Sequence, residues 1–99
     1  MAFNDTIHQP VRLRILSALC TLAEDDSVDF PVLRDHLDTT DGNLGAHLRK
    51  LADVGYVGIR KSFVDGKPRT SVNASAAGRA AFLEHVIALQ EIIRGPARL

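Results

Sequence analysis

The 99-residue chain has a single cysteine, Cys20, which excludes an intramolecular disulfide framework and fits a reducing compartment. It has no excess charge, because twelve Lys and Arg residues balance twelve Asp and Glu residues. No apolar run approaches the roughly 18 residues of a membrane span. The first ten residues also lack the basic start and long apolar core of a signal peptide. These absences predict one cytoplasmic domain, residues 1–99, with no membrane contact.

Motifs of catalysis and metal binding are also missing. The sequence contains no G-x-S-x-G, phosphate loop or H-E-x-x-H motif, so we do not expect an enzyme. One cysteine cannot supply a paired thiolate site. The four histidines, His8, His36, His47 and His85, do not have ligand spacing. We therefore expect neither metal nor cofactor.

The first half of the chain predicts two helices. Pro10 is tolerated in the first turn of a helix, and the apolar residues that follow recur at helical spacing. They are Val11, Ile15, Leu19 and Leu22. A strand at 28–29 and a short helix over 30–37 follow, with Asp29 as the expected N-cap.

A third helix is predicted to begin at Thr39 or Thr40, because either hydroxyl can cap it. Gly55 is placed to end this helix. Its expected buried stripe recurs at spacings of four and three, and consists of Leu44, Leu48, Leu51 and Val54.

The second half of the chain predicts a β-hairpin and a last helix. Residues 56–64 and 69–73 are strand-like and flank Asp65-Gly66, the dipeptide typical of a hairpin turn. Residues 75–94 then form a helix, which Gly95-Pro96 ends. The order predicts an α+β, mainly α fold: a winged helix-turn-helix with a three-helix core, a hairpin wing and a C-terminal dimerisation helix. Such a fold can place its third helix in the major groove of DNA.

The zero net charge argues against a polyanionic partner only when it is averaged over the chain. Residues 42–70 contain six basic and two acidic residues, a net charge of +4. Residues 1–30 contain two basic and five acidic residues, a net charge of −3. The predicted third helix and hairpin therefore carry the positive charge that phosphate contact requires.

The polar face of the third helix offers base and phosphate contacts. Asn43 can pair with adenine, and Arg49 or Lys50 can reach guanine or a phosphate. Lys67 and Arg69 flank Pro68 just past the turn, as expected for a wing tip that contacts DNA. The alternatives are a solvated helix face and basic residues that only keep an edge strand soluble.

Several stretches between Arg12 and Phe82 together resemble one protein family. They are R-L-R-I-L, F-P-V-L-R-D-H-L, T-D-G-N-L-G-A-H-L-R-K-L, G-Y-V, K-S-F, G-K-P-R-T and A-A-G-R-A-A-F. The family comprises small winged-helix transcriptional regulators related to the multiple-antibiotic-resistance and arsenic-resistance repressors. The resemblance implies a prokaryotic, dimeric regulator, with repression as its sign.

The resemblance also assigns residues to the DNA interface. It gives the recognition-helix role to Asp41, Gly42, Asn43, Ala46, His47 and Lys50, and the wing role to Lys61, Lys67, Pro68 and Arg69. With the cap Thr40 and with Arg49, these form the predicted DNA-binding set. Gly45 and Ala46 depart from the family pattern, where Ser, Gln or Arg is common. Such small residues remove two possible base contacts, so we expect DNA shape to contribute more to recognition.

The last helix is too apolar for an isolated surface helix and predicts a homodimer. The expected interface consists of Phe3, Ile7, Phe82, Val86, Leu89, Ile92 and Ile93. Packing within the chain's own core is the alternative. A small-molecule effector, if one exists, is expected between the dimer helices.

The sequence thus predicts a sequence-specific regulator that binds double-stranded DNA as a homodimer, most simply a repressor. The competing hypothesis is a winged-helix module that binds another protein and not DNA. The overall neutrality and the small Gly45 and Ala46 favour that module. The basic third helix and hairpin favour DNA.

Overall fold

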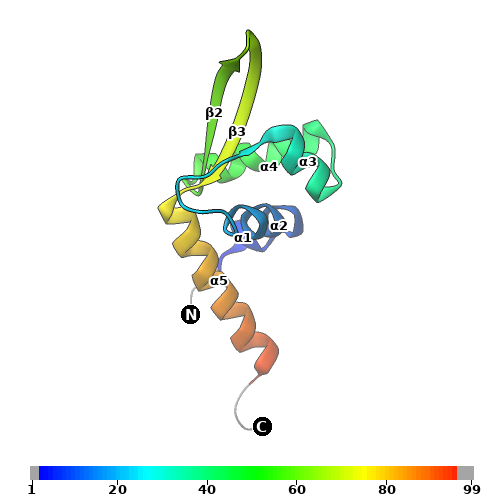
Figure 1. Ribbon diagram of the computed structural model, residues 1–99. Coiled ribbons are helices and arrows are strands. Elements are labelled where there is room, and N and C mark those ends of the chain that lie inside the picture. Colours follow the sequence, from blue (N-terminus) through cyan, green and yellow to red (C-terminus); the bar gives the residue numbers. More distant parts are fainter. Residues whose placement is uncertain (1–2, 96–99) are drawn as a thin grey trace.

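A computed structural model describes residues 3–95 as a helical body with a small antiparallel sheet (Figure 1). The elements are α1 (Asp5–His8), α2 (Pro10–Leu19), β1 (Val28–Asp29), α3 (Phe30–Leu37), α4 (Asp41–Asp53), β2 (Val57–Val64), β3 (Lys67–Ala74) and α5 (Ala76–Arg94). The strands lie in the order β1-β3-β2. The predicted winged helix-turn-helix is confirmed. Within residues 3–95, no helix is long and apolar enough to cross a membrane.

The core forms where three helices meet the base of the sheet. The inner faces of α2, α3 and α4 supply side chains that are at most 3% exposed: Ile15, Leu16, Leu19, Leu33, Leu37, Leu44, Leu48 and Leu51. Val72 of β3 is fully buried against them. Burial of each such side chain contributes roughly 1.5–3 kcal/mol. The predicted apolar stripes are confirmed in their central turns.

The first long helix is shorter than predicted. α2 ends at Leu19, so Leu22 lies half-buried in the following turn and not on the helix. Arg79 of α5 donates hydrogen bonds to the carbonyls of Leu19 and Ala23, at 3.5 and 3.2 Å. A cation is favourable at the C-terminal end of a helix, so a residue of α5 supports the end of α2.

The predicted burial of Val54 was wrong, and the predicted cap Asp29 is confirmed in position only. Val54 is the C-cap of α4 and is 48% exposed, because the buried stripe stops at Leu51. Asp29 is the N-cap residue of α3 as predicted, but its side chain makes no capping hydrogen bond. Its Oδ2 instead lies 3.3 Å from Nε of Arg69 on β3.

The hairpin forms as predicted and is longer than expected. β3 begins at Lys67, two residues before the predicted start, and pairs with β2 along its full length. Val64 and Lys67 face each other beside the turn. Asp65 and Gly66 have φ angles of 52° and 76°, the left-handed values that a type I′ turn requires.

Helix α5 starts in close contact with the entry to β2. Ser75 caps it, since its Oγ accepts from the Gly78 amide at 2.9 Å, and it donates to the Gly55 carbonyl at 2.6 Å. A Cβ on Gly78 would lie 2.0 Å from the carbonyl oxygen of Tyr56. The helix can approach Tyr56 this closely only because residue 78 has no side chain.

The short helix α1 was not predicted. Asn4 caps it by accepting from the Ile7 amide at 3.0 Å, and also donates to the Tyr56 hydroxyl at 2.9 Å. Ile7 is fully buried in the core of its own chain. Its predicted place on a dimer surface is therefore corrected.

A histidine pair, also missed from sequence, joins α1 to α5. His85 is fully buried, and its Nδ1 accepts the Asn4 amide hydrogen at 3.0 Å. The proton of the neutral ring is therefore on Nε2, which donates to Nδ1 of His8 at 3.2 Å. The ring of Phe3 packs on both imidazoles. Burial lowers the pKa of His85, His8 lowers it further, and Asp5 opposes the shift.

Paired glycine substitutions test the contact at the start of α5. Gly78→Ala should destabilise the protein by roughly 1–3 kcal/mol, because the new methyl group meets backbone that must move. Gly45→Ala is the matched control, since α4 leaves that position with no atom within 4 Å. It should stabilise by roughly 0.5–1 kcal/mol through helix propensity. Urea unfolding measures both, and equal stabilisation by the two variants would contradict the contact.

The histidine pair predicts a pH dependence of stability. The folded chain keeps His85 neutral, whereas the unfolded chain takes up a proton below the ordinary pKa of 6.5. The free energy of unfolding should therefore fall as the pH falls below about 6.5. His85→Asn should flatten this slope in part, because the pKa of His47 is lowered too. His36→Asn, at an exposed position, is the control. An unchanged slope in His85→Asn would refute the assignment.

Candidate nucleic-acid interface

The outward face of α4 carries most of the residues predicted to contact DNA. Burial of its leucines turns the opposite side of the helix to solvent. Exposed on that side are Asp41, Gly42, Asn43, Ala46, Arg49, Lys50 and Asp53, and His47 is half-buried at the edge. The helix thus presents amide, cationic and small side chains together, and their contact with DNA remains a prediction.

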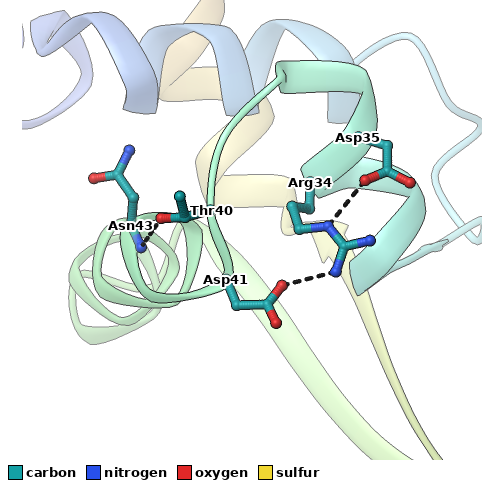
Figure 2. Close-up of polar contacts among 5 residues, drawn as sticks. All are labelled: Arg34, Asp35, Thr40, Asp41 and Asn43. Carbon is teal, nitrogen blue, oxygen red and sulfur yellow. Dashed lines mark hydrogen bonds and ion pairs between the residues drawn. The ribbon is translucent and has the colours of Figure 1, made fainter.

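The first turn of α4 is fixed by two threonines, of which Figure 2 shows Thr40 with its contact to Asn43. The Oγ1 of Thr40 accepts from the Asn43 amide at 3.1 Å, which makes Thr40 the cap. The Oγ1 of Thr39 accepts from the Asn43 side-chain Nδ2 at 2.8 Å. The side chain of Asn43 is therefore held in place, while its amide oxygen and second N–H have no partner within residues 3–95 and can meet a base edge.

Arg34 connects α3 to the start of α4, a role that sequence reasoning missed. Figure 2 shows its guanidinium between Asp35 and Asp41, with both N···O distances 2.9 Å. Hydrogen bonds to these carboxylates raise the pKa of Arg34, so it stays cationic. Asp41 is an acid on the face predicted to meet phosphates, and Arg34 offsets its charge. No spacing rule relates these two residues, because the turn between the helices sets their distance.

The side chain of His47 is oriented by α2. Nη1 of Arg12 lies 3.2 Å from Nδ1 of His47. Arginine can only donate, so Nδ1 accepts and the proton of the neutral ring is on Nε2. Burial lowers the pKa of His47, and the nearby cations Arg12 and Lys50 lower it further. His47 therefore offers one N–H donor at the edge of the α4 face.

The four predicted wing residues lie on two sides of the hairpin. Side chains alternate along a strand, and directly paired residues share a side. The inner side of the wing faces the helices at its base, where Val72 is buried, and carries Lys61 and Pro68 further out. The outer side of the wing carries Lys67 and Arg69.

The cations of the wing differ in whether a carboxylate forms an ion pair with them. Arg69 is paired with Asp29 across the sheet, so its charge is partly offset. Lys61, Lys67 and Arg60 are exposed, and no ion pair to them occurs within residues 3–95. These three side chains, which include Arg60 from outside the predicted set, are the freest cations of the wing.

An apolar groove lies between α2 and α3. Its volume is about 480 Å³, and its lining includes Leu22, Val28 and Val32. The effector was predicted between dimer helices, and this groove is at a different place in the fold.

Comparison with known proteins identifies the family of this chain. Residues 11–93 match the family described as "Winged helix DNA-binding domain". The uncharacterized protein MJ0432 of Methanocaldococcus jannaschii is 34% identical over 82 residues, which cover 83% of this chain and 86% of the relative.

Solved structures of other proteins share the fold of this chain. A transcriptional regulator homologue from Pyrococcus horikoshii OT3 superposes with a TM-score of 0.83 at 31% identity, covering 91% of this chain and 86% of that one. A mutant of MepR from a multidrug resistant clinical isolate of S. aureus shares the fold, with a TM-score of 0.66 at 15% identity over 82% of this chain and 57% of its own. The predicted resemblance to winged-helix transcriptional regulators is confirmed. The chain belongs to the winged helix DNA-binding domain family.

Proposed function

We propose that this protein is a homodimeric transcriptional regulator that binds double-stranded DNA. Helix α4 lies in the major groove, and the hairpin contacts the backbone or the adjacent minor groove. The observation that carries the proposal is the exposed polar face of α4 beside a basic hairpin, in a chain of a DNA-binding family. The protein works in the prokaryotic cytoplasm, on the chromosome.

Several side chains on the outward face of α4 have a role in this proposal. The Asn43 amide reads adenine, while Arg49 and Lys50 reach guanine or phosphate. The Nε2–H of His47 donates to a phosphate or a base acceptor. Gly45 and Ala46 let the helix approach closely without adding base contacts, so the shape of the duplex contributes to selectivity.

The dimer is proposed to form through α5. Its C-terminal half projects away from the body (Figure 1). Four large apolar residues along the helix are exposed: Leu83 at 61%, Ile87 at 46%, Ile92 at 55% and Ile93 at 82%. Phe82, Val86 and Leu89 of the originally predicted stripe are half-buried on their own chain. The proposed interface therefore shifts toward Leu83 and Ile87, with Phe3 of 42% exposure at its edge.

A two-fold dimer would present its two α4 helices to half-sites about one helical turn apart. When bound at a promoter it would hinder the polymerase, so repression is the proposed sign. An effector that binds between the dimer helices would change the spacing of the two α4 helices.

Salt dependence tests the proposed DNA binding. If each protomer contacts about six phosphates, log K for a random-sequence duplex should fall with a slope near −5 against log salt. Lys50→Ala should weaken binding and reduce the slope by about one. Arg94→Ala, at the far end of α5, removes the same charge away from the interface and should change neither. An absence of duplex binding at low salt would refute the proposal and favour the protein-binding module.

Charge introduced on α5 tests the proposed dimer. The double variant Leu83→Glu/Ile87→Glu would bury two carboxylates, so its dissociation constant should rise at least about hundredfold. Ala77→Glu is the control, because it adds one carboxylate at an exposed site on the Glu84 side of the helix and should leave the dimer intact. Analytical ultracentrifugation measures the mass. A monomeric wild type, or a dimeric double variant, would contradict this interface.

A further inference from the structure

The tip of the hairpin carries an exposed aromatic residue that no role described so far uses. Phe63 is 75% exposed, and its direct partner on β3 is Pro68. Both belong to the inner side of the wing, beyond the point where the helices cover it (Figure 1). Within residues 3–95, the aromatic contacts involve Phe3 and two histidines, and none involves Phe63.

The surroundings of Phe63 are cationic on both sides of the hairpin. Lys61 precedes it by two residues on the inner side, and Lys67 follows the turn on the outer side. Arg60 adds a further exposed cation on the outer side. The one acid at the tip, Asp65, supplies the left-handed turn residue. An apolar pair thus lies at the end of a ribbon whose two sides both carry lysine.

This arrangement matches the minor groove of a DNA duplex. The groove has a phosphate backbone on each wall, and the bases offer apolar faces when a step is opened. A ribbon that enters end-on brings Lys61, on its inner side, to one wall and Lys67, on its outer side, to the other. Phe63 is closer to the tip than Lys61 and therefore lies deeper in the groove. Proteins that bind the minor groove use inserted Phe or Pro side chains to unstack a base step and kink the duplex.

The reach of the hairpin fits the same arrangement. Eight residues in each strand, at about 3.4 Å per residue, give a ribbon of roughly 27 Å. Half a turn of B-DNA is about 17 Å. With α4 in the major groove, the tip can therefore reach the neighbouring minor groove.

We propose that Phe63, backed by Pro68, is a wedge that the wing inserts into the minor groove, where it unstacks a base step and bends the DNA. This inference rests on the proposed DNA binding. It assigns the protein a preference for easily unstacked pyrimidine–purine steps such as TA. That preference supplies selectivity which the small Gly45 and Ala46 do not.

The test compares Phe63→Ala and Phe63→Leu with the wild type on two 30-bp duplexes. One duplex has TA steps and 2-aminopurine beside them, and the other has an A-tract of the same base composition. Dyes at the two ends report bending, and 2-aminopurine fluorescence reports unstacking. Val32→Ala, which removes another exposed apolar side chain outside the hairpin, is the control.

The wild type and Val32→Ala should bend the TA duplex, raise its 2-aminopurine fluorescence and bind it more tightly than the A-tract duplex. Phe63→Ala should lose the bend and the fluorescence change, and bind roughly tenfold more weakly. Its salt slope should stay unchanged, because the phosphate contacts remain. Phe63→Leu should retain part of the bend. Equal melting temperatures would show that the variants are folded.

Two outcomes separate the wedge from the DNA binding on which it rests. If the wild type binds both duplexes with the expected salt slope and Phe63→Ala bends the TA duplex equally well, only the wedge is overturned. If the wild type binds neither duplex at low salt, the proposed function fails and the wedge fails with it. A loss of affinity with a reduced salt slope would also overturn the wedge, since Phe63 would then act by positioning the lysines.

Discussion

Burial of the α4 leucines is the constraint on which the rest of the interface depends. Leu44, Leu48 and Leu51 are essentially inaccessible to solvent, and this fixes the rotation of the helix about its own axis. Every exposed group on α4 is outward because these three are inward. The threonine contacts to Asn43 and the Arg12 contact to His47 then refine the position of single side chains on a helix whose orientation the core has already determined.

Periodicity made much of this fold predictable. The features that were missed or wrongly predicted are those for which a pattern of neighbouring residues gives no signal. Leucine spacing located the helices, and Asp65-Gly66 located the hairpin, because each signal lies within a few neighbouring residues. The α1 helix is only four residues long, too short to show a period. The burial of Val54 was overestimated since the stripe gives no signal for its last turn. Contacts such as His8 with His85, 77 residues apart, depend on the folded path of the chain.

The sequence predicted which residues of the candidate interface are exposed, but it did not predict the ion pairs that they and their neighbours form. The polar face of α4 follows from helical rotation alone, and the two-sided wing follows once the turn fixes Val64 opposite Lys67. The partners of Asp29 and Asp41 do not follow, since Arg69 and Arg34 reach them across a sheet and a turn. These two ion pairs also place acids beside the basic surface, so the pair of Asp29 with Arg69 partly offsets the positive charge of residues 42–70.

The joint at the start of α5 determines where a dimer would place its wing tips along the DNA. One residue, Ser75, separates β3 from α5, and the wing and the helix leave this joint in opposite directions (Figure 1). Together they form a lever whose arms are roughly 27 Å long for the wing and roughly 29 Å for the helix. A rotation of about 10° at the joint would displace the wing tip by about 5 Å, more than one base-pair step of about 3.4 Å. The close contact between Gly78 and Tyr56 restricts rotation at this joint, and it therefore fixes the position of the wing tip relative to α5.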